Sequence, residues 1–202
     1  PLFLYHIKPK TMNRLLKIYF LILFQISFGQ KSKVDLKIDQ KIDSLKENRV
    51  ENFIVFSQNC VGCFPKIMLK DKCNSDETQY LFWKKDMVSY QQKFDECSDY
   101  KAIKLENSKL IDLIITNYKQ IKSEEIRPAE YKKGKYMIRM IVDHYSYTIL
   151  KFINKNDSFQ KQLIDYQLET KMIDNKMPNQ NYLYNQSTIL KKVLDLVKKE
   201  IN

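Results

Sequence analysis

The fold is decided by one stretch of the sequence, Tyr80-Leu81-Phe82-Trp83-Lys84-Lys85-Asp86-Met87-Val88-Ser89-Tyr90-Gln91-Gln92-Lys93-Phe94. Its first four residues are all apolar or aromatic, which is typical of a strand that is covered on both faces. Asp86 and Met87 predict a turn, and the run from Ser89 to Phe94 predicts an antiparallel return strand. We therefore expect a β-hairpin inside the sheet of this protein.

The residues before this hairpin predict a helix and a further strand. Over residues 31–48, apolar side chains recur every three or four positions, as in a helix that buries one face. These side chains are Val34, Ile38, Ile42 and Leu45. The run Phe53-Ile54-Val55-Phe56-Ser57 is rich in strand-forming residues. We expect the helix to pack its apolar face on the sheet.

The residues after the hairpin predict a second unit of the same kind. A helix that Ser108 can cap is expected over 107–122. Strands are expected over 136–142, 145–153 and 159–168, and Ser187 is expected to cap a last helix. Residues 158–163 resemble residues 89–94, and each segment is the return strand of a predicted hairpin that a helix follows. The expected fold is α+β: a mainly antiparallel sheet from two hairpin-helix units, with an N-terminal and a C-terminal helix packed on it.

The first 29 residues carry the pattern of an export signal. Arg14 and Lys17 precede an apolar run over 18–26, and Ser27 and Gly29 are small residues suited to a cleavage site. The run is shorter than the ~20 residues that span a bilayer, so a retained membrane anchor is the less favoured alternative. We expect residues 1–11 to be upstream non-native residues, residues 12–29 to be the signal peptide, and residues 30–202 to form a single α+β domain. The domain is expected in the periplasm or outside the cell.

Composition excludes several classes of enzyme. Beyond residue 29 the chain has only the glycines Gly62 and Gly134, so a glycine-rich phosphate loop and a GxSxG hydrolase motif do not occur. His144 is the one histidine there, which excludes an HExxH metalloprotease. Loss of residues 1–29 removes four basic residues and no acid, and lowers the net charge from +11 to +7. The only dense basic cluster is Lys132-Lys133-Gly134-Lys135. We expect a solvated lysine-rich surface, and a nucleic-acid or anionic-lipid patch is the weaker interpretation.

Four cysteines, Cys60, Cys63, Cys73 and Cys97, lie close together in the sequence. In an exported chain, an even number of cysteines first indicates disulfides. The predicted hairpin places Cys97 opposite residue 76, which brings it within bridging reach of Cys73. We therefore predict the bridges Cys73–Cys97 and Cys60–Cys63, and expect the first to stabilise the domain by about 3 kcal/mol.

The motif Cys60-Val61-Gly62-Cys63 has two further chemical interpretations. Residues 53–63 resemble in outline the redox site of thioredoxin-type proteins, where a thiol at a helix start attacks disulfides. The resemblance implies that Cys60 and Cys63 are redox residues, although Pro65 follows the pair instead of lying between them. The spacing of the four cysteines also permits a zinc site. His144, next to two tyrosines, is expected to be an ordinary strand residue.

No arrangement of acids or nucleophiles in the sequence indicates a catalytic site. Asp95, Glu96, Glu124, Glu125 and Asp165 are expected in turns or in solvent. We therefore expect an exported, non-enzymatic domain that is stabilised by disulfides and binds a protein or a small molecule. The alternative is a thiol-disulfide redox protein, and the second alternative is a zinc-binding domain with the four cysteines as ligands. We expect no cofactor, no metal, no nucleic-acid partner and no stable membrane span after signal cleavage.

Overall fold

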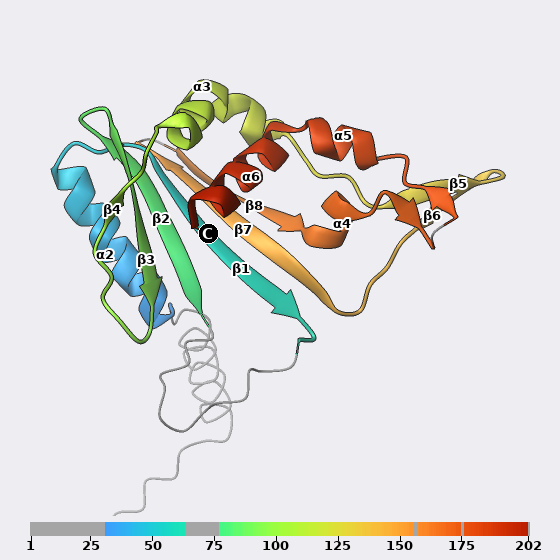
Figure 1. The fold of residues 1–202 in the computed structure, drawn as a ribbon, viewed down its shortest axis with the longest axis horizontal. Helices are drawn as coiled ribbons and strands as arrows, with labels where there is room; N and C mark the ends of the chain where they lie inside the picture. Colours follow the sequence, from blue (N-terminus) through green and yellow to red (C-terminus); the bar gives the residue numbers. More distant parts are fainter. Residues whose placement is uncertain (1–30, 64–76, 156, 175, 202) are drawn as a thin grey trace, which may run out of the picture.

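One antiparallel sheet organises the chain (Figure 1). The computed structural model describes residues 31–63, 77–155, 157–174 and 176–201. The sheet has six strands in the order β4-β3-β2-β1-β7-β8. The elements are α2 (Lys33–Glu47), β1 (Phe53–Val61), β2 (Thr78–Lys85), β3 (Val88–Asp95), β4 (Ile103–Lys104), α3 (Lys109–Ser123), β5 (Glu130–Lys133), β6 (Tyr136–Arg139), β7 (Tyr145–Asn154), β8 (Asp157–Ile164), α4 (Asp165–Glu169), β9 (Met172–Ile173), β10 (Met177–Pro178), α5 (Tyr182–Ser187) and α6 (Ile189–Ile201). The predicted α+β fold is confirmed, and its two hairpins, β2–β3 and β7–β8, flank β1.

The β2–β3 hairpin has the expected turn. Lys85 pairs with Val88, so Asp86 and Met87 form the two-residue loop. Their φ angles are 48° and 66°, as a type I′ turn requires, and this turn matches the twist of the flanking strands. Phe82 and Trp83 are both buried, because β2 lies inside the sheet and apolar clusters form on both of its faces.

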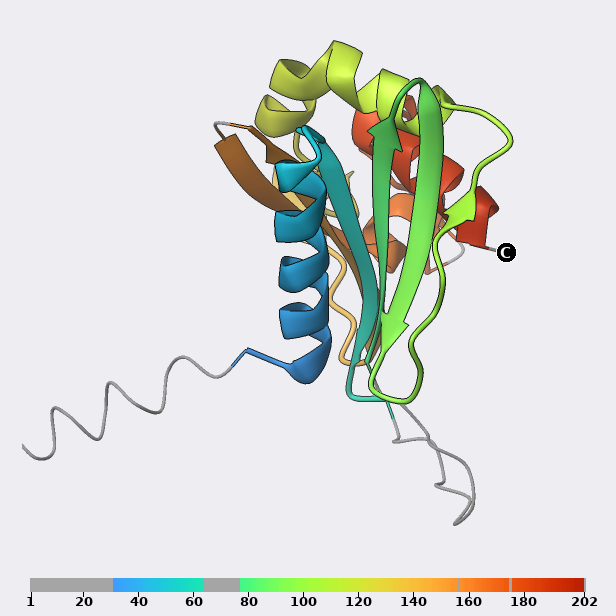
Figure 2. The same cartoon turned by 90° about the vertical axis from the view of Figure 1, so that its left-hand side faces the viewer.

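Each face of the sheet has its own apolar core. Alternate residues of a strand point to opposite faces, so Val55 belongs to the cluster under α2, and Ile54 belongs to the cluster under α3 and α6. Figure 2 shows α2 and α6 on opposite sides of the sheet. The four predicted apolar residues of α2 are all buried, and Ser32 caps this helix by accepting a hydrogen bond from the backbone nitrogen of Asp35 at 3.0 Å.

Helix α2 covers only part of its face. It contacts β2 and β3, where Leu81 and Trp83 supply an apolar floor. On the neighbouring strands β7 and β8, Ile149 and Lys151 are partly exposed and Gln160 is exposed. The β7–β8 part of this face and the adjoining end of β1, at Ser57 and Asn59, therefore remain open to solvent beside α2.

The C-terminal part differs from the prediction at three boundaries. Strand β6 ends at Arg139, and β8 ends at Ile164, where α4 begins. The cap of α6 is Thr188, whose Oγ1 accepts a hydrogen bond from the backbone nitrogen of Lys191 at 3.1 Å. The Ser187 hydroxyl instead donates to the carbonyl oxygen of Tyr184 at 2.7 Å, at the end of α5. The prediction of a Ser187 cap was wrong because Ser187 and Thr188 are adjacent and both residue types are favoured as helix caps. The sequence alone does not distinguish between them.

Strands β5 and β6 form a two-stranded ribbon that is separate from the main sheet and extends to the right in Figure 1. Two buried asparagines hold its base. Asn179 accepts a hydrogen bond from the backbone nitrogen of Glu130 at 3.3 Å. Asn181 donates to the Glu130 carboxylate and to the carbonyl oxygen of Pro128, each at 3.0 Å. The ribbon is thus fixed at one end, and all four residues of β6 are exposed.

The predicted signal peptide lies outside the described residues. Residues 1–30 are not described, so cleavage and export stay predictions. Within the ranges that the structure describes, no helix is long and apolar enough to cross a bilayer.

Candidate functional site

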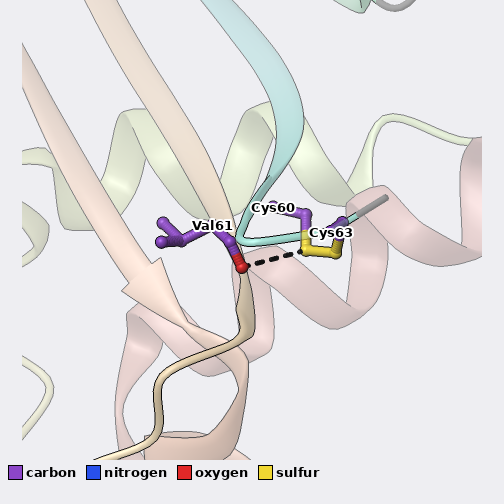
Figure 3. The surroundings of a disulfide bond; sticks show 3 residues. All are labelled: Cys60, Val61 and Cys63. Atoms are coloured by element: carbon purple, nitrogen blue, oxygen red, sulfur yellow. Dashed lines mark hydrogen bonds between the residues drawn. A yellow bond between two sulfur atoms is a disulfide. The ribbon is translucent and has the colours of Figure 1, made fainter. Parts of the chain in front are cut away.

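The Cys60–Cys63 pair lies at the end of β1 (Figure 3). The two Cα atoms are 5.7 Å apart, a usual separation for bridged cysteines. Cys60, Gly62 and Cys63 are all exposed. The Sγ of Cys60 lies 3.6 Å from the carbonyl oxygen of Val61. Because a bridged sulfur carries no proton, this contact can become a hydrogen bond only after reduction. The pair is at disulfide distance, as predicted, where solvent reaches it.

The pairing of β1 with β7 brings His144 to the same place. Val61 pairs with Tyr145, so the next residue of the chain, Gly62, meets His144. A Cβ atom on Gly62 would lie 2.9 Å from Nε2 of His144, and the φ angle of +70° also favours glycine. The expectation that His144 is an ordinary strand residue was wrong: it lies in the bend before β7, against the glycine between the two cysteines.

The position of Cys60 differs from the thioredoxin-type arrangement. Cys60 is still a residue of β1 and pairs with Ser146 of β7. Among the residues that the structure describes around the pair, no helix begins at Cys60, and a helix N-terminus is the feature that lowers a thiol pKa in that family. Pro65, which follows the pair, lies outside the described residues.

Cys73 also lies outside the described residues, so the Cys73–Cys97 bridge stays a prediction. Near Cys97, Asp95 was expected in a turn or in solvent; it is the last residue of β3 and is 4% exposed. Burial by itself would raise the pKa of Asp95, but hydrogen bonds from Tyr100 and from the backbone nitrogens of Ser98 and Cys97 hold it below the usual value. These hydrogen bonds fix the start of the loop between β3 and β4, where Asp95 is the last residue of β3.

A groove runs beside α2 over the open part of the sheet. Its volume is about 340 Å³. Its lining includes three carboxylates, from Asp35, Asp39 and Glu77, and two ammonium groups, from Lys31 and Lys151. Ser57 and Asn59 of β1 add polar groups to its lining. Polar and charged side chains dominate this surface, unlike the apolar floor under α2.

Gln79 organises the carboxylates of the groove. Its side chain is 7% exposed, and its Nε2 donates to Oδ1 of Asp35 at 2.9 Å and to Oε1 of Glu77 at 2.7 Å. The Ser32 hydroxyl donates to the same Glu77 oxygen at 3.1 Å. Two carboxylates are therefore fixed side by side in the lining of the groove.

Lys31 is held at the groove by a second acid of α2. Its Nζ donates to Oδ2 of Asp39 at 2.5 Å, and this hydrogen bond raises the pKa of Lys31. None of these groove residues was predicted from the sequence. The available signal was the spacing of Asp35 and Asp39, which places both on one flank of the helix, but their partners on the sheet depend on the fold.

Asp165 is a further group on the α6 face near the Cys60 end of the sheet. It was expected in a turn or in solvent, but it begins α4, where burial raises its pKa, and its Oδ1 has no hydrogen-bond partner among the described residues. Tyr147 pairs with Ile164, so Asp165 begins α4 beside Ser146, the β7 partner of Cys60. The carboxyl of Asp165, whose pKa is raised, thus follows β8 on the far side of β7 from Cys60.

The described part of the chain contains no group of three or more His, Cys, Asp and Glu side chains placed to bind a metal. Two of the four cysteines proposed as zinc ligands, Cys60 and Cys63, are bridged to each other. A bridged sulfur is not a thiolate, so the geometry offers the zinc alternative no support.

Comparison with known proteins gives this chain no relative. No family model matches it, and neither a curated protein nor a solved structure is significantly similar. Its function must therefore be inferred from its own geometry.

Proposed function

We propose that this chain is an exported, non-enzymatic binding domain that takes a small zwitterionic ligand in the groove beside α2. The observation that carries the proposal is the groove itself, a cavity of about 340 Å³ beside α2 whose lining residues are mostly polar or charged. Cavities of roughly 300–1,000 Å³ are typical of small-ligand sites. Export rests on the signal pattern over 12–29.

The charges in the groove favour a ligand with an ammonium and a carboxylate group. Asp35 and Glu77 are held together by Gln79, so they can accept hydrogen bonds from one ammonium group without moving. Lys151 lines the same groove from β7 and can pair with a carboxylate. An amino acid or a dipeptide carries both groups within a length that fits this volume.

Calorimetric titration of the full chain at pH 7 tests this proposal. The panel is a dipeptide, a dicarboxylate and a diamine of similar size, and we expect the dipeptide to bind most tightly. Asp35→Asn removes one charge but keeps the oxygen that accepts from Gln79. It should weaken dipeptide binding about tenfold or more, since a hydrogen bond to a charged group contributes ~1.5–3 kcal/mol.

Asp43→Asn is the matched control, because Asp43 is an acid of the same helix that does not line the groove. Equal losses in Asp35→Asn and Asp43→Asn would refute the proposal. So would a folded protein that binds no member of the panel.

Thiol-disulfide exchange is a second candidate, favoured by the exposed Cys60–Cys63 pair with His144 against Gly62. In this reaction an external thiolate attacks one sulfur of the pair. A mixed disulfide forms, the Cys60–Cys63 bond breaks, and the other cysteine leaves as a thiolate. In this candidate that thiolate takes its proton from His144, which lies against Gly62 between the two cysteines.

Equilibration with glutathione, followed by alkylation and mass measurement, tests this candidate. We expect ready reduction of the pair and a changed pH profile of the reduction rate in His144→Gln. The candidate fails if the pair resists glutathione, or if His144→Gln reacts like the unmodified protein at every pH.

A further inference from the structure

The β5–β6 ribbon concentrates positive charge. It carries four cations and a single acid, which gives it a net charge of +3. The cations are Lys132, Lys133, Lys135 and Arg139. The acid, Glu130, is at the base, where its carboxylate accepts a hydrogen bond from Asn181. The far end of the ribbon, around Gly134, is therefore purely basic.

The same ribbon exposes apolar side chains. Tyr136, Met137 and Ile138 are 63%, 49% and 39% exposed, although they are consecutive residues of β6. Tyr131 pairs with Ile138 and Lys133 pairs with Tyr136, so one face of the ribbon presents two tyrosines, an isoleucine and a lysine. Cationic and apolar groups are thus interleaved and not segregated.

The ribbon is held in place from its base. Isolated two-stranded hairpins are marginally stable in water, but here the Asn179 and Asn181 side chains bind the backbone and carboxylate of Glu130. The backbone nitrogen of Met140 also donates to the carbonyl oxygen of Ala129 at 2.8 Å, and Ala129 is fully buried. The exposed side chains are therefore presented on a preformed surface.

We propose that the β5–β6 ribbon docks on the surface of a bilayer rich in anionic lipids. The lysines pair with the headgroups, and Tyr136 and Ile138, which share one face of the ribbon, enter the interfacial layer. Tyrosine is favoured at this depth of a membrane, and lysine stems lie along apolar surface while their ammonium groups reach polar headgroups. This proposal is independent of the groove and of the disulfide.

The apolar side chains favour a membrane over a nucleic acid. A phosphate backbone would pair with the same lysines, but it would leave the apolar surface of Tyr136 and Ile138 against water. A bilayer satisfies both sets of groups at once. The basic cluster was visible in the sequence, and the structure adds the exposed apolar residues on the same ribbon.

A reporter in the ribbon tests the proposal in the full chain. Tyr136→Trp places an indole on the exposed face, and Trp83, which is 3% exposed, supplies an internal reference. Vesicles of phosphatidylglycerol and phosphatidylcholine in equal amounts, with brominated acyl chains, should quench the new indole and leave Trp83 emission unchanged. Vesicles of phosphatidylcholine alone should not. The readout is local, so binding through the apolar run over 18–26 does not produce it.

Charge variants in the reporter background separate the ribbon from overall charge. Each lysine near an anionic surface contributes about fivefold in affinity, so Lys132→Gln, Lys133→Gln and Lys135→Gln together should weaken binding roughly a hundredfold. The control combines Lys101→Gln, Lys119→Gln and Lys199→Gln, which change the net charge equally at exposed positions elsewhere. The control should retain quenching.

Four results would overturn the proposal. They are no quenching of the new indole, equal quenching by neutral and anionic vesicles, equal losses in the two triple variants, and binding to duplex DNA without binding to vesicles. Analytical ultracentrifugation without lipid gives a further check. A dimer that Ile138→Ser abolishes would assign this surface to a second copy of the chain instead.

Discussion

Asn185 is expected to hold the C-terminal third of the protein together. It is completely buried. Its Oδ1 accepts from the backbone nitrogen of Arg127 at 2.9 Å, and its Nδ2 donates to the carbonyl oxygens of Arg127 and Gln167, each at 2.9 Å. One side chain therefore joins the segment after α3 to α4 and α5. No backbone ladder replaces these bonds among the described residues of those segments.

Asn185→Leu keeps the approximate volume of the side chain and removes all three hydrogen bonds. One backbone donor and two carbonyl oxygens lose their partner. At the low end of the range for such groups, about 1 kcal/mol each, the loss is about 3 kcal/mol. For a domain of this size, that should lower Tm by roughly 6–12 °C.

Asn185→Asp makes the test sharper. The new carboxylate can still accept from the Arg127 nitrogen, but it places an oxygen where the amide donated to two carbonyl oxygens. Because the fold disfavours the charged form, the pKa of the new carboxyl rises on folding. The loss of stability should therefore be largest at neutral pH and should shrink as the pH falls and a proton restores one donor.

Urea unfolding followed by circular dichroism at several pH values measures both effects. Asn117→Leu is the control, because the Asn117 amide donates one hydrogen bond, to the carbonyl oxygen of Leu113 at 2.8 Å. The role of Asn185 is refuted if Asn185→Leu lowers the free energy of unfolding by less than about 1 kcal/mol, or by no more than Asn117→Leu does. Asn185 would then not join the segment after α3 to α4 and α5 in the way proposed.

Three further predictions address the other parts of the fold. Gly62→Ala should cost about 1–2 kcal/mol for its backbone conformation and more for displacing His144; urea unfolding of a double-mutant cycle with His144→Ala should show coupling, and zero coupling would contradict the contact. Asp165→Asn should stabilise the protein at pH 7, because burial raises the pKa of Asp165 and the folded state loses stability as the pH rises through that raised pKa. Urea unfolding should show a larger gain at pH 7 than at pH 3, and an equal gain at both pH values would contradict this reason. Ile38→Ala, at a 3% exposed position of α2, should cost about 2–4 kcal/mol and speed hydrogen exchange in α2, whereas Leu36→Ala on the exposed side of that helix should change little.

Local patterns predicted most of the secondary structure. The apolar spacing of Val34, Ile38, Ile42 and Leu45 located α2, and the apolar run at Tyr80 located a central strand. These patterns are sufficient to locate a helix or strand because each depends only on the repeat and the burial of that one element. The Asp86–Met87 turn was also recognised, although its residues lack the glycine that usually marks such a loop.

Long-range pairing could not be predicted in the same way. Residues 136–142 were expected to form a strand of the main sheet. Strand β6 belongs instead to the separate β5–β6 ribbon, and the composition of a strand does not indicate which partner it pairs with. The contact of His144 with Gly62 depends on the β1–β7 register. Pro128 and Arg127, which accept hydrogen bonds from Asn181 and Asn185, lie 53 and 58 residues away in the chain, so the polar segment of these asparagines had the pattern of an ordinary loop.

The open part of the sheet nevertheless follows from the sequence once the register is known. On the face that α2 covers, β2 presents Leu81 and Trp83. On the same face, β7 and β8 present Lys151 opposite Gln160. A helix laid over the second pair would bury an ammonium and an amide without partners, which costs several kcal/mol. α2 therefore packs where the floor is apolar, and the polar strands beside it remain available to a ligand that can pair with them.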